Sequence, residues 1–190
     1  MVDTQNNTGW ITRKVRTVYP DLTFVLGGAA SGKSAFAEQV VVSEGKNKIY
    51  VATSQVFDDE MEQKVQRHLA QRGADWTTIE APLDLGPDLA RLTPNDICLI
   101  DCATMWLTNH MLAENDLDQV QSALLQALRS CRAPIVIVSN EVGHGIVPDN
   151  ALSRRFREAQ GRLNIALAAQ ADLAVQVTAG LPLVLKGQLP

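Results

Sequence analysis

A glycine-rich segment near the start of the chain has the residue types and spacing of a phosphate-binding loop. It reads Gly27-Gly28-Ala29-Ala30-Ser31-Gly32-Lys33-Ser34 and matches the pattern GxxxxGK[ST] in full. Glycines let backbone N–H groups curl around phosphate oxygens, and a helix N-terminus adds partial positive charge. We expect Lys33 to reach the β- and γ-phosphates of a nucleoside triphosphate and the Ser34 hydroxyl to bind Mg²⁺. The alternative, a glycine turn with an incidental lysine, is disfavoured because a strand pattern precedes the segment and a helix pattern follows it.

An acidic residue follows a second buried strand pattern. Asp101 comes directly after the apolar run Ile97–Ile100. Phosphate-binding loops work with a carboxylate at the end of a neighbouring strand, which orders the metal ion and its water. Asp101 could equally cap the helix that follows it, and the two interpretations are compatible. The glycine-rich loop favours the metal role.

A third candidate lies in the predicted helix Asp58–Arg72. At 100° per residue, Met61, Val65, His68 and Arg72 fall within about 60° of one another on one face. From position alone His68 fits a core histidine with satisfied hydrogen bonds. A buried arginine needs a partner, and a phosphate would supply one. His68 is therefore a candidate nucleophile, with Arg72 as an anion clamp.

The remaining histidines and the arginine-rich helix give weaker signals. His110 and His144 have no acidic, cysteine or histidine partner at a metal-ligand spacing such as HExxH. We interpret His110 as a surface or packing residue. His144 stays open, because its loop follows a central strand, where α/β sheets bind ligands. The cluster at 154–157 is typical of a solvated helix face, which an anionic substrate could recruit.

Composition limits the classes of function. The 190 residues carry 17 Lys and Arg against 21 Asp and Glu, a net charge of −4, which argues against general nucleic-acid or anionic-membrane binding. Three cysteines without a CxxC pair predict reduced thiols in a cytoplasmic protein. No apolar run reaches the roughly 18 residues of a membrane helix, and the N-terminus lacks an apolar signal-peptide centre.

The elements that must position these residues alternate between strands and helices, which predicts an α/β domain with a mostly parallel central sheet, helices on both faces and a closing C-terminal hairpin. Residues 1–20 are expected to form a flexible extension and residues 21–190 a single P-loop domain. The predicted strands are Leu22–Leu26, Lys48–Thr53, Trp76–Glu80, Ile97–Ile100, Pro134–Ser139 (the central one), Leu173–Thr178 and Leu183–Lys186. The predicted helices are Lys33–Ser43, Asp58–Arg72, Leu83–Leu92 (broken at Gly86-Pro87), Ala103–Ala113, Leu117–Cys131 and Asp149–Ala171.

An ordered set of motifs from Thr23 to Lys186 closely resembles a known family, the bifunctional adenosylcobinamide kinase/adenosylcobinamide-phosphate guanylyltransferases. Besides the glycine-rich loop, the resemblance depends on stretches at 50–54, 58–61, 67–68, 101–109, 140–148 and 161–164, with the single residues Arg72, Trp76 and Glu80. The glycine-rich loop alone is generic, whereas the complete ordered set is highly specific.

The resemblance implies two activities on one chain. The first phosphorylates adenosylcobinamide with ATP or GTP, and the second transfers GMP from GTP to adenosylcobinamide phosphate through a GMP–histidine intermediate. The family histidine falls on His68, which agrees with its predicted inward position. The resemblance also implies a trimer. It assigns nucleotide contacts to Gly27, Gly28, Ala29, Ala30, Ser31, Gly32, Lys33, Ser34, Ala52, Thr53, Ser54, Arg72, Glu80 and Asp101.

The chain departs from the family pattern at three positions, none of them a candidate catalytic residue. Ala30 replaces a common arginine, His144 a methionine and Glu158 an aspartate. Two other hypotheses stay in view. A plain P-loop small-molecule kinase would use no covalent step, and a nucleotide-switched regulatory protein would need long insertions or a partner domain, which this compact chain lacks. No residue stands out in the sequence as the general base of the kinase step.

Overall fold

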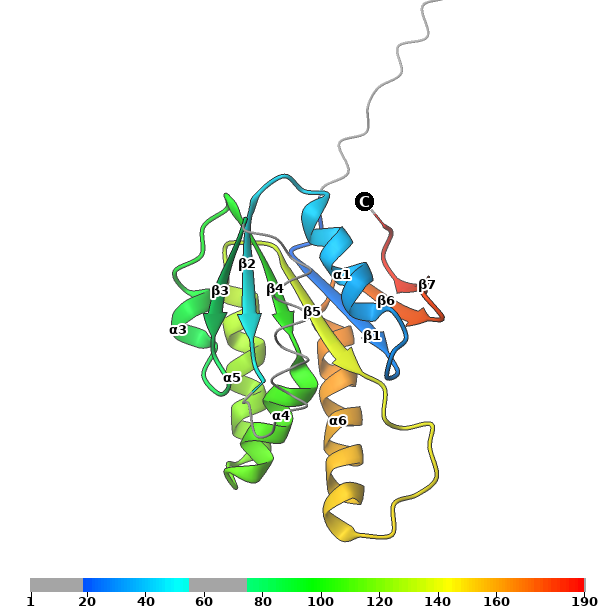
Figure 1. Cartoon of the computed structure of the whole chain (residues 1–190). Helices are drawn as coiled ribbons and strands as arrows, with labels where there is room; N and C mark the ends of the chain where they lie inside the picture. The colour runs from blue at the N-terminus through cyan, green and yellow to red at the C-terminus, as the bar shows by residue number, and fades with distance from the viewer. Residues whose placement is uncertain (1–18, 55–74, 190) are drawn as a thin grey trace, which may run out of the picture.

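The computed structural model describes residues 19–54 and 75–189. These residues form a seven-stranded sheet in the order β3-β2-β4-β5-β1-β6-β7, in which only the β6–β7 pair is antiparallel (Figure 1). The strands are β1 (Leu22–Gly27), β2 (Asn47–Ala52), β3 (Trp76–Glu80), β4 (Asp96–Asp101), β5 (Ile135–Asn140), β6 (Leu173–Thr178) and β7 (Leu181–Lys186). The helices are α1 (Lys33–Val42), α3 (Gly86–Leu89), α4 (Ala103–Leu112), α5 (Leu117–Ser130) and α6 (Ala151–Gln170).

Helices cover both faces of the sheet, as predicted. Figure 1 shows α1 against one face and α5 and α6 against the other. Each face has its own hydrophobic core, one built around α1 and the other around α3, α4, α5 and α6. Strand β5 lies in the middle of the sheet and its first five residues are buried, which confirms the predicted central strand.

The element boundaries agree with the predicted ones to within two residues except in one helix. Gly86-Pro87 begins helix α3 and does not break one, because a proline's fixed φ suits the first helical turn. The predicted helix over 83–92 was therefore too long. In the closing hairpin, Leu181 and Pro182 belong to β7, and the turn is Ala179-Gly180, both with positive φ. Proline is tolerated there because β7 is an edge strand.

Two further expectations can be compared with the described residues. All three cysteines are free, with Cys98 and Cys102 buried and Cys131 half-buried, which confirms the predicted unpaired thiols. None of the helices in the described ranges is long and apolar enough to cross a membrane. The predicted helix Asp58–Arg72 and the first 18 residues lie outside the described residues.

Candidate active site

The glycine-rich loop joins the carboxyl end of β1 to the start of α1 at the middle of the sheet's carboxyl edge (Figure 1). The Ser31 N–H donates to the Gly28 carbonyl at 3.3 Å, which closes a tight turn inside the loop. A Cβ on Gly27 would lie 2.7 Å from the Val177 carbonyl oxygen, and Gly32 has a φ of 91°. Both positions therefore require glycine, and the loop has the tight backbone path that its sequence predicts.

The start of α1 suits an anion. Gly32 is the N-cap and provides no side-chain hydrogen bond, so the N–H groups of the first turn have no capping side chain. Lys33 begins the helix, and its Nζ donates to the Gly28 carbonyl at 3.1 Å, which places the ammonium group across the loop. Ser34 follows in the first turn and is half-buried. The predicted phosphate-binding residues therefore share one tight segment of backbone between β1 and α1.

Asp101 lies at the carboxyl end of β4, separated from β1 by β5 alone. Its carboxylate is half-buried and accepts a hydrogen bond from the Tyr50 hydroxyl at 3.3 Å. The N-cap of α4 is Cys102, and that helix has no side-chain cap, so the structure does not give Asp101 the capping role. Two strand spacings separate β4 from β1, which puts Asp101 about 10 Å from the loop along the edge.

The charges of Asp101 and Lys33 both act on the pKa of the buried Cys102 thiol. Burial and the nearby Asp101 carboxylate raise the pKa of Cys102 to about 12, and the Lys33 ammonium group acts in the opposite direction. Cys102 is therefore a neutral thiol at physiological pH. Its position also indicates that Asp101 and Lys33 both lie within electrostatic range of the start of α4.

The ends of β2 and β4 are fastened together by side chains. The Thr53 hydroxyl donates to the Cys102 carbonyl at 2.8 Å and accepts from the Cys102 N–H at 2.7 Å. The Asn109 amide donates to the carbonyls of Thr53 and Pro82, at 2.7 and 2.8 Å. Thr53 is completely buried, so its hydroxyl fixes the strand ends.

The sheet register places Ala52 and Glu80, two more of the predicted nucleotide contacts. Ser54 follows just after the end of β2. Ala52 pairs with Asp101 on one side and with Glu80 on the other, so the three positions form a row across β4, β2 and β3. Ala52 and Ser54 are half-buried, and Glu80 is exposed at the end of β3. Four strand spacings separate β3 from β1, or roughly 19 Å. The structure therefore brings Asp101 near the loop and leaves Glu80 at the far end of the same edge.

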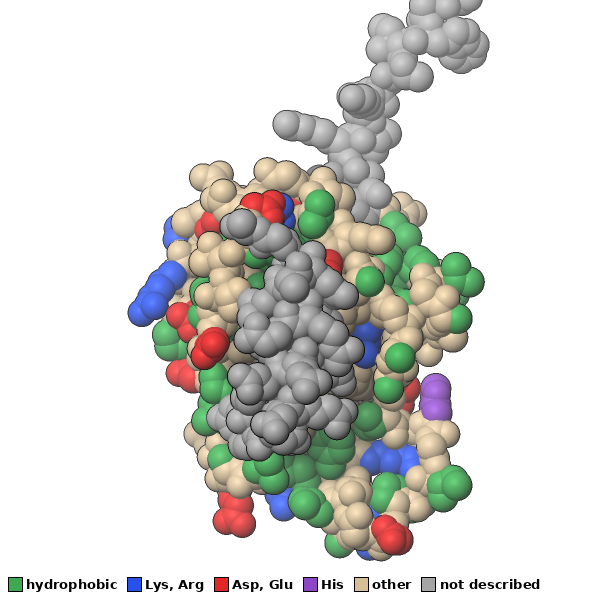
Figure 2. All heavy atoms as spheres, in the orientation of Figure 1, with side chains coloured by type: hydrophobic (Ala, Val, Ile, Leu, Met, Phe, Trp, Pro, Cys, Tyr) green, Lys and Arg blue, Asp and Glu red, His purple; other side chains and the backbone are tan. Residues whose placement is uncertain are grey.

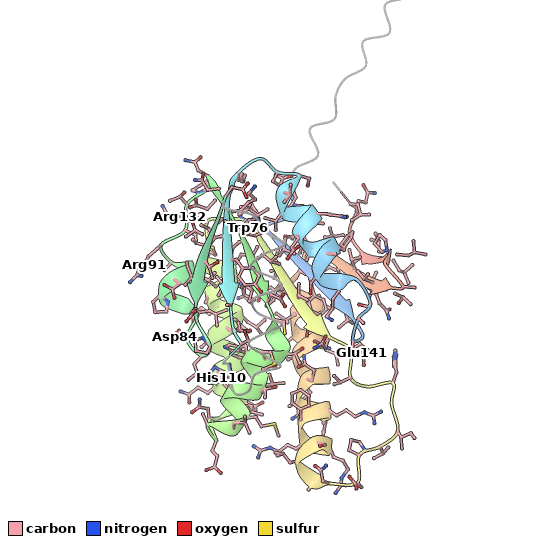
Figure 3. All side chains as sticks on the ribbon, viewed as in Figure 1. Trp76, Asp84, Arg91, His110, Arg132 and Glu141 are labelled. Carbon is pink, nitrogen blue, oxygen red and sulfur yellow. The ribbon has the colours of Figure 1, made fainter. Side chains whose placement is uncertain are left out.

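The sequence analysis did not identify Glu141 as a candidate. This carboxylate follows β5, the strand between β1 and β4, and the Glu141 N–H donates to the Gly27 carbonyl at 3.0 Å. Its carboxylate accepts from the Gly143 N–H, and Figure 3 shows the side chain where β5 leaves the sheet. The usable signal was its place just after the most apolar strand, the same signal that identified Asp101.

The histidines fall into three cases. His110 is buried in α4, where its Nε2 lies 3.1 Å from the Leu83 carbonyl oxygen and its Nδ1 lies 2.8 Å from Asn115 Nδ2. These partners indicate a neutral ring that donates from Nε2, and confirm the packing interpretation. His144 is exposed in the β5–α6 loop. His68 and Arg72 lie outside the described residues, so their predicted roles remain predictions.

The sheet and the loop together define a P-loop NTPase-like nucleotide-binding protein. The solved structure of the RadB recombinase is similar, with a TM-score of 0.51 at 19% identity over 83% of this chain and 74% of that one, a likeness that concerns the fold alone. The family model described as cobinamide kinase / cobinamide phosphate guanyltransferase matches residues 23–185.

Two curated relatives match most of the chain. The bifunctional adenosylcobalamin biosynthesis protein CobP of Pseudomonas aeruginosa is 41% identical over 167 residues, which are 86% of this chain and 96% of that protein. The bifunctional adenosylcobalamin biosynthesis protein CobU of Salmonella typhimurium is 40% identical over 181 residues, 87% of this chain and 99% of that protein. The chain belongs to the cobinamide kinase / cobinamide phosphate guanylyltransferase family and is a bifunctional kinase and nucleotidyltransferase. This membership confirms the resemblance identified in the sequence.

Proposed function

We propose that the chain phosphorylates adenosylcobinamide and then transfers GMP from GTP to the new phosphate through a covalent intermediate on His68. The observation that carries the proposal is the uncapped start of α1 with Lys33 folded across it, on the same edge as Asp101. The two relatives act in adenosylcobalamin biosynthesis by their names, and we assign this chain to the same process.

The guanylyl transfer divides into two displacements at one phosphorus. An imidazole nitrogen of His68 attacks the α-phosphorus of GTP, and the bond to the β-phosphate oxygen breaks, which releases pyrophosphate. A phosphate oxygen of adenosylcobinamide phosphate then attacks the same phosphorus and breaks the P–N bond. The products are adenosyl-GDP-cobinamide and the free histidine. A neutral imidazole is nucleophilic near pH 7, which suits it to the first step.

The glycine-rich loop stabilises the leaving group in the first displacement and the transferred group in the kinase step. Backbone N–H groups of 28–34 and the Lys33 ammonium group neutralise the charge that develops on the β- and γ-phosphates. Phosphoryl transfer needs positioning more than a strong base. The loop would contact phosphates, which ATP and GTP share, so one loop can serve both nucleotides. Arg72, Ala52, Ser54 and Glu80 are proposed to complete the nucleotide site.

The donor set around the loop fits Mg²⁺. Within residues 19–54 and 75–189 no three or more His, Cys, Asp or Glu side chains gather into a closed metal cage. Mg²⁺ prefers few protein oxygens, with phosphates and water completing its shell, and the Ser34 hydroxyl and Asp101 carboxylate are such oxygens. When bound, the ion neutralises phosphate charge. We propose these two residues as its ligands.

We also propose that the chain works in the cytoplasm as a homo-oligomer, a trimer as its family resemblance implies. The support is the edge strand β7, whose six residues are all exposed, including Leu181, Leu183 and Leu185. Figure 2 shows hydrophobic side chains gathered on the side of the molecule where this hairpin lies. Sedimentation equilibrium of the full chain tests the trimer.

Covalent labelling tests the intermediate. The full-length protein is incubated with Mg²⁺ and GTP labelled at the α-phosphate, then denatured, with His68→Ala beside it. We expect label that stays on the wild-type chain, survives alkali, is lost in acid and is absent from His68→Ala, because a phosphoramidate has that stability. His144→Ala is the matched control, since His144 is an exposed loop histidine, and it should label like the wild type.

The second candidate, a P-loop small-molecule kinase without a covalent step, gives the opposite result. It predicts no acid-labile label on any variant, together with nucleotide turnover that survives His68→Ala. Equal label on the wild type and His68→Ala would reject His68 as the nucleophile while keeping the covalent route.

A further inference from the structure

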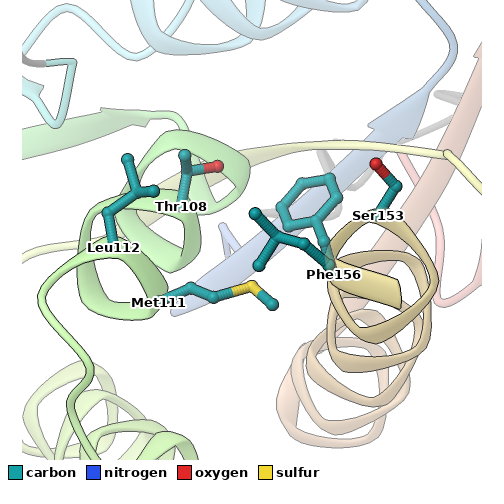
Figure 4. Close-up of a pocket in the computed structure, with 6 residues that line it drawn as sticks. Thr108, Met111, Leu112, Ser153 and Phe156 are labelled. Carbon is teal, nitrogen blue, oxygen red and sulfur yellow. The ribbon is translucent and has the colours of Figure 1, made fainter. Parts of the chain in front are cut away.

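A second concave site lies beyond the carboxyl edge, between α4 and the first turns of α6. Its volume is about 200 Å³, and it is lined by Thr108, Met111, Leu112, Leu152, Ser153 and Phe156. Figure 4 shows the Phe156 ring and the Met111 side chain facing each other across the space between the two helices. Leu112 and Leu152 are 58% and 56% exposed, so the walls present apolar surface to solvent. None of the predicted nucleotide-binding residues lines it.

The base of this gap is polar. Thr104 lies one helical turn closer to the sheet than Thr108 and belongs to a polar cluster at the end of β5. Its Oγ1 accepts a hydrogen bond from the Asn140 N–H at 2.8 Å. The Gln160 amide, one turn closer than Phe156, donates to Ser139 Oγ at 2.9 Å. Gln160 is completely buried, and its Oε1 has no hydrogen-bond partner. An unpaired hydrogen-bond acceptor therefore lies one helical turn below the apolar pocket.

The pocket is also close to the phosphate-binding loop. Asn140 ends β5, which pairs directly with β1, and the two strands place Asn140 opposite Gly27. Thr108 lies four residues along α4 from Thr104, a rise of about 6 Å. The pocket therefore lies at the same end of the sheet as the phosphate-binding loop, beyond the carboxyl ends of β4 and β5. In open α/β sheets, this region beyond the strands' carboxyl ends is where ligands bind.

We propose that this pocket between α4 and α6 binds an edge of the corrinoid ring of cobinamide, the acceptor in both reactions. A corrin ring presents methyl groups and neutral carboxamide arms at its rim. The methyl groups match the apolar walls, the flexible Met111 adapts to an irregular rim, and the hydroxyls of Thr108 and Ser153 in the lining can hydrogen-bond a carboxamide arm. The inference rests on the proposed function, because the corrinoid is the acceptor there.

The test replaces the two exposed wall residues together, Leu112→Gln and Leu152→Gln, in the full chain. Glutamine keeps length and helix propensity while removing apolar contact. We expect the KM for adenosylcobinamide phosphate to rise about tenfold, as the apolar burial of two leucines predicts, with the KM for GTP unchanged. Ile165→Gln is the matched control, since Ile165 is 72% exposed on the same helix α6 outside the pocket.

Two separate readouts distinguish this inference from the proposed function. Self-guanylylation with labelled GTP needs no corrinoid, so it should be the same in the double variant as in the wild type. Equilibrium dialysis of adenosylcobinamide without nucleotide should show the loss of affinity directly. A KM and an affinity for the corrinoid within twofold of the Ile165→Gln values would overturn the pocket assignment. A double variant that changed only its oligomeric state, with corrinoid binding kept, would overturn it too. Absence of self-guanylylation in every protein, with weakened corrinoid binding in the double variant, would reject the covalent step and keep the pocket.

Discussion

The glycine-rich loop and the adjoining ends of β2 and β4 occupy the same edge of the sheet but are built in opposite ways. The loop is held by backbone hydrogen bonds such as Ser31 N–H to the Gly28 carbonyl, and no side chain caps the helix that it starts. The ends of β2 and β4 are held by side chains, with Thr53 and Asn109 together donating or accepting four hydrogen bonds to backbone groups. The loop keeps its donors for a ligand, whereas the strand ends use theirs within the protein.

This difference predicts that substitutions in the two regions affect different quantities. In the loop they should change catalysis and leave stability nearly unchanged. At Asn109, whose side chain donates to the carbonyls of Thr53 and Pro82, a substitution should change stability and leave the kinetic constants nearly unchanged.

Lys33→Ala should have the largest effect. It removes the positive charge that lies across the loop, at 3.1 Å from the Gly28 carbonyl, and we expect kcat/KM for both reactions to fall at least about 100-fold. The free energy of unfolding should change by less than about 1 kcal/mol, because the side chain is half-buried and the acceptor of its hydrogen bond, the Gly28 carbonyl, is neutral. Steady-state assays of each reaction and urea unfolding measure the two quantities.

Lys46→Ala is the control for this variant, because Lys46 follows α1 at the end of the helix away from the loop. It should keep both activities. A large loss of stability in Lys33→Ala would contradict the contrast between the regions, since the lysine would then be a structural element.

Asn109→Ala should have the second largest effect and should change stability. The side chain is 3% exposed, and its loss leaves the carbonyls of Thr53 and Pro82 without their donor. We expect the free energy of unfolding to fall by about 2 to 4 kcal/mol, with the KM for GTP within about threefold of the wild type. Urea unfolding and initial rates below the unfolding temperature check both values.

A different result for Asn109→Ala would be informative. If stability were kept while the KM for GTP rose more than tenfold, the strand ends would belong to the nucleotide site itself, and the contrast drawn above would fail.

The smallest effect concerns His110, which packs beside the same strand ends. Burial lowers its pKa, opposed by the hydrogen bond to the Leu83 carbonyl and by the charge of Asp84. Because the folded-state pKa is the lower one, the unfolded chain takes up the proton first. The stabilising contribution is therefore complete above the unfolded pKa of about 6.5 and is lost as the pH falls below it.

Urea unfolding at several pH values on either side of 6.5, for the wild type and for His110→Gln, measures this effect. The wild type should lose more stability than the variant as the pH falls. Parallel curves for the two proteins would show that His110 does not titrate differently in the folded and unfolded chains.

Local patterns were enough to predict the elements and the phosphate-binding loop. Alternating apolar runs mark the strands, and the loop is contiguous in sequence, so Gly27 to Ser34 needed no knowledge of the fold. The central strand β5 was predicted as well, because burial on both faces produces a continuous apolar run.

Features that depend on pairing between distant segments were not predicted. The place of Glu141 just after an apolar strand was a usable signal, but its closeness to the loop became visible when the strand order placed β5 between β1 and β4. The pocket between α4 and α6 requires Met111 and Phe156 to face each other from helices separated by the whole of α5 and β5. The place of Glu80 at the far end of the edge likewise follows from the order of the strands.

The closing hairpin has a consequence for the order in which the molecule can assemble. The Gly180 N–H donates to the Ser31 carbonyl at 2.8 Å, and β1 pairs with β5 on one side and β6 on the other. During synthesis the strands β5 and β6 and the hairpin turn that support the phosphate-binding loop are made more than 100 residues after it. The loop is therefore translated before the strands and the hairpin that hold it, and we expect it to reach its working geometry only after they have been made.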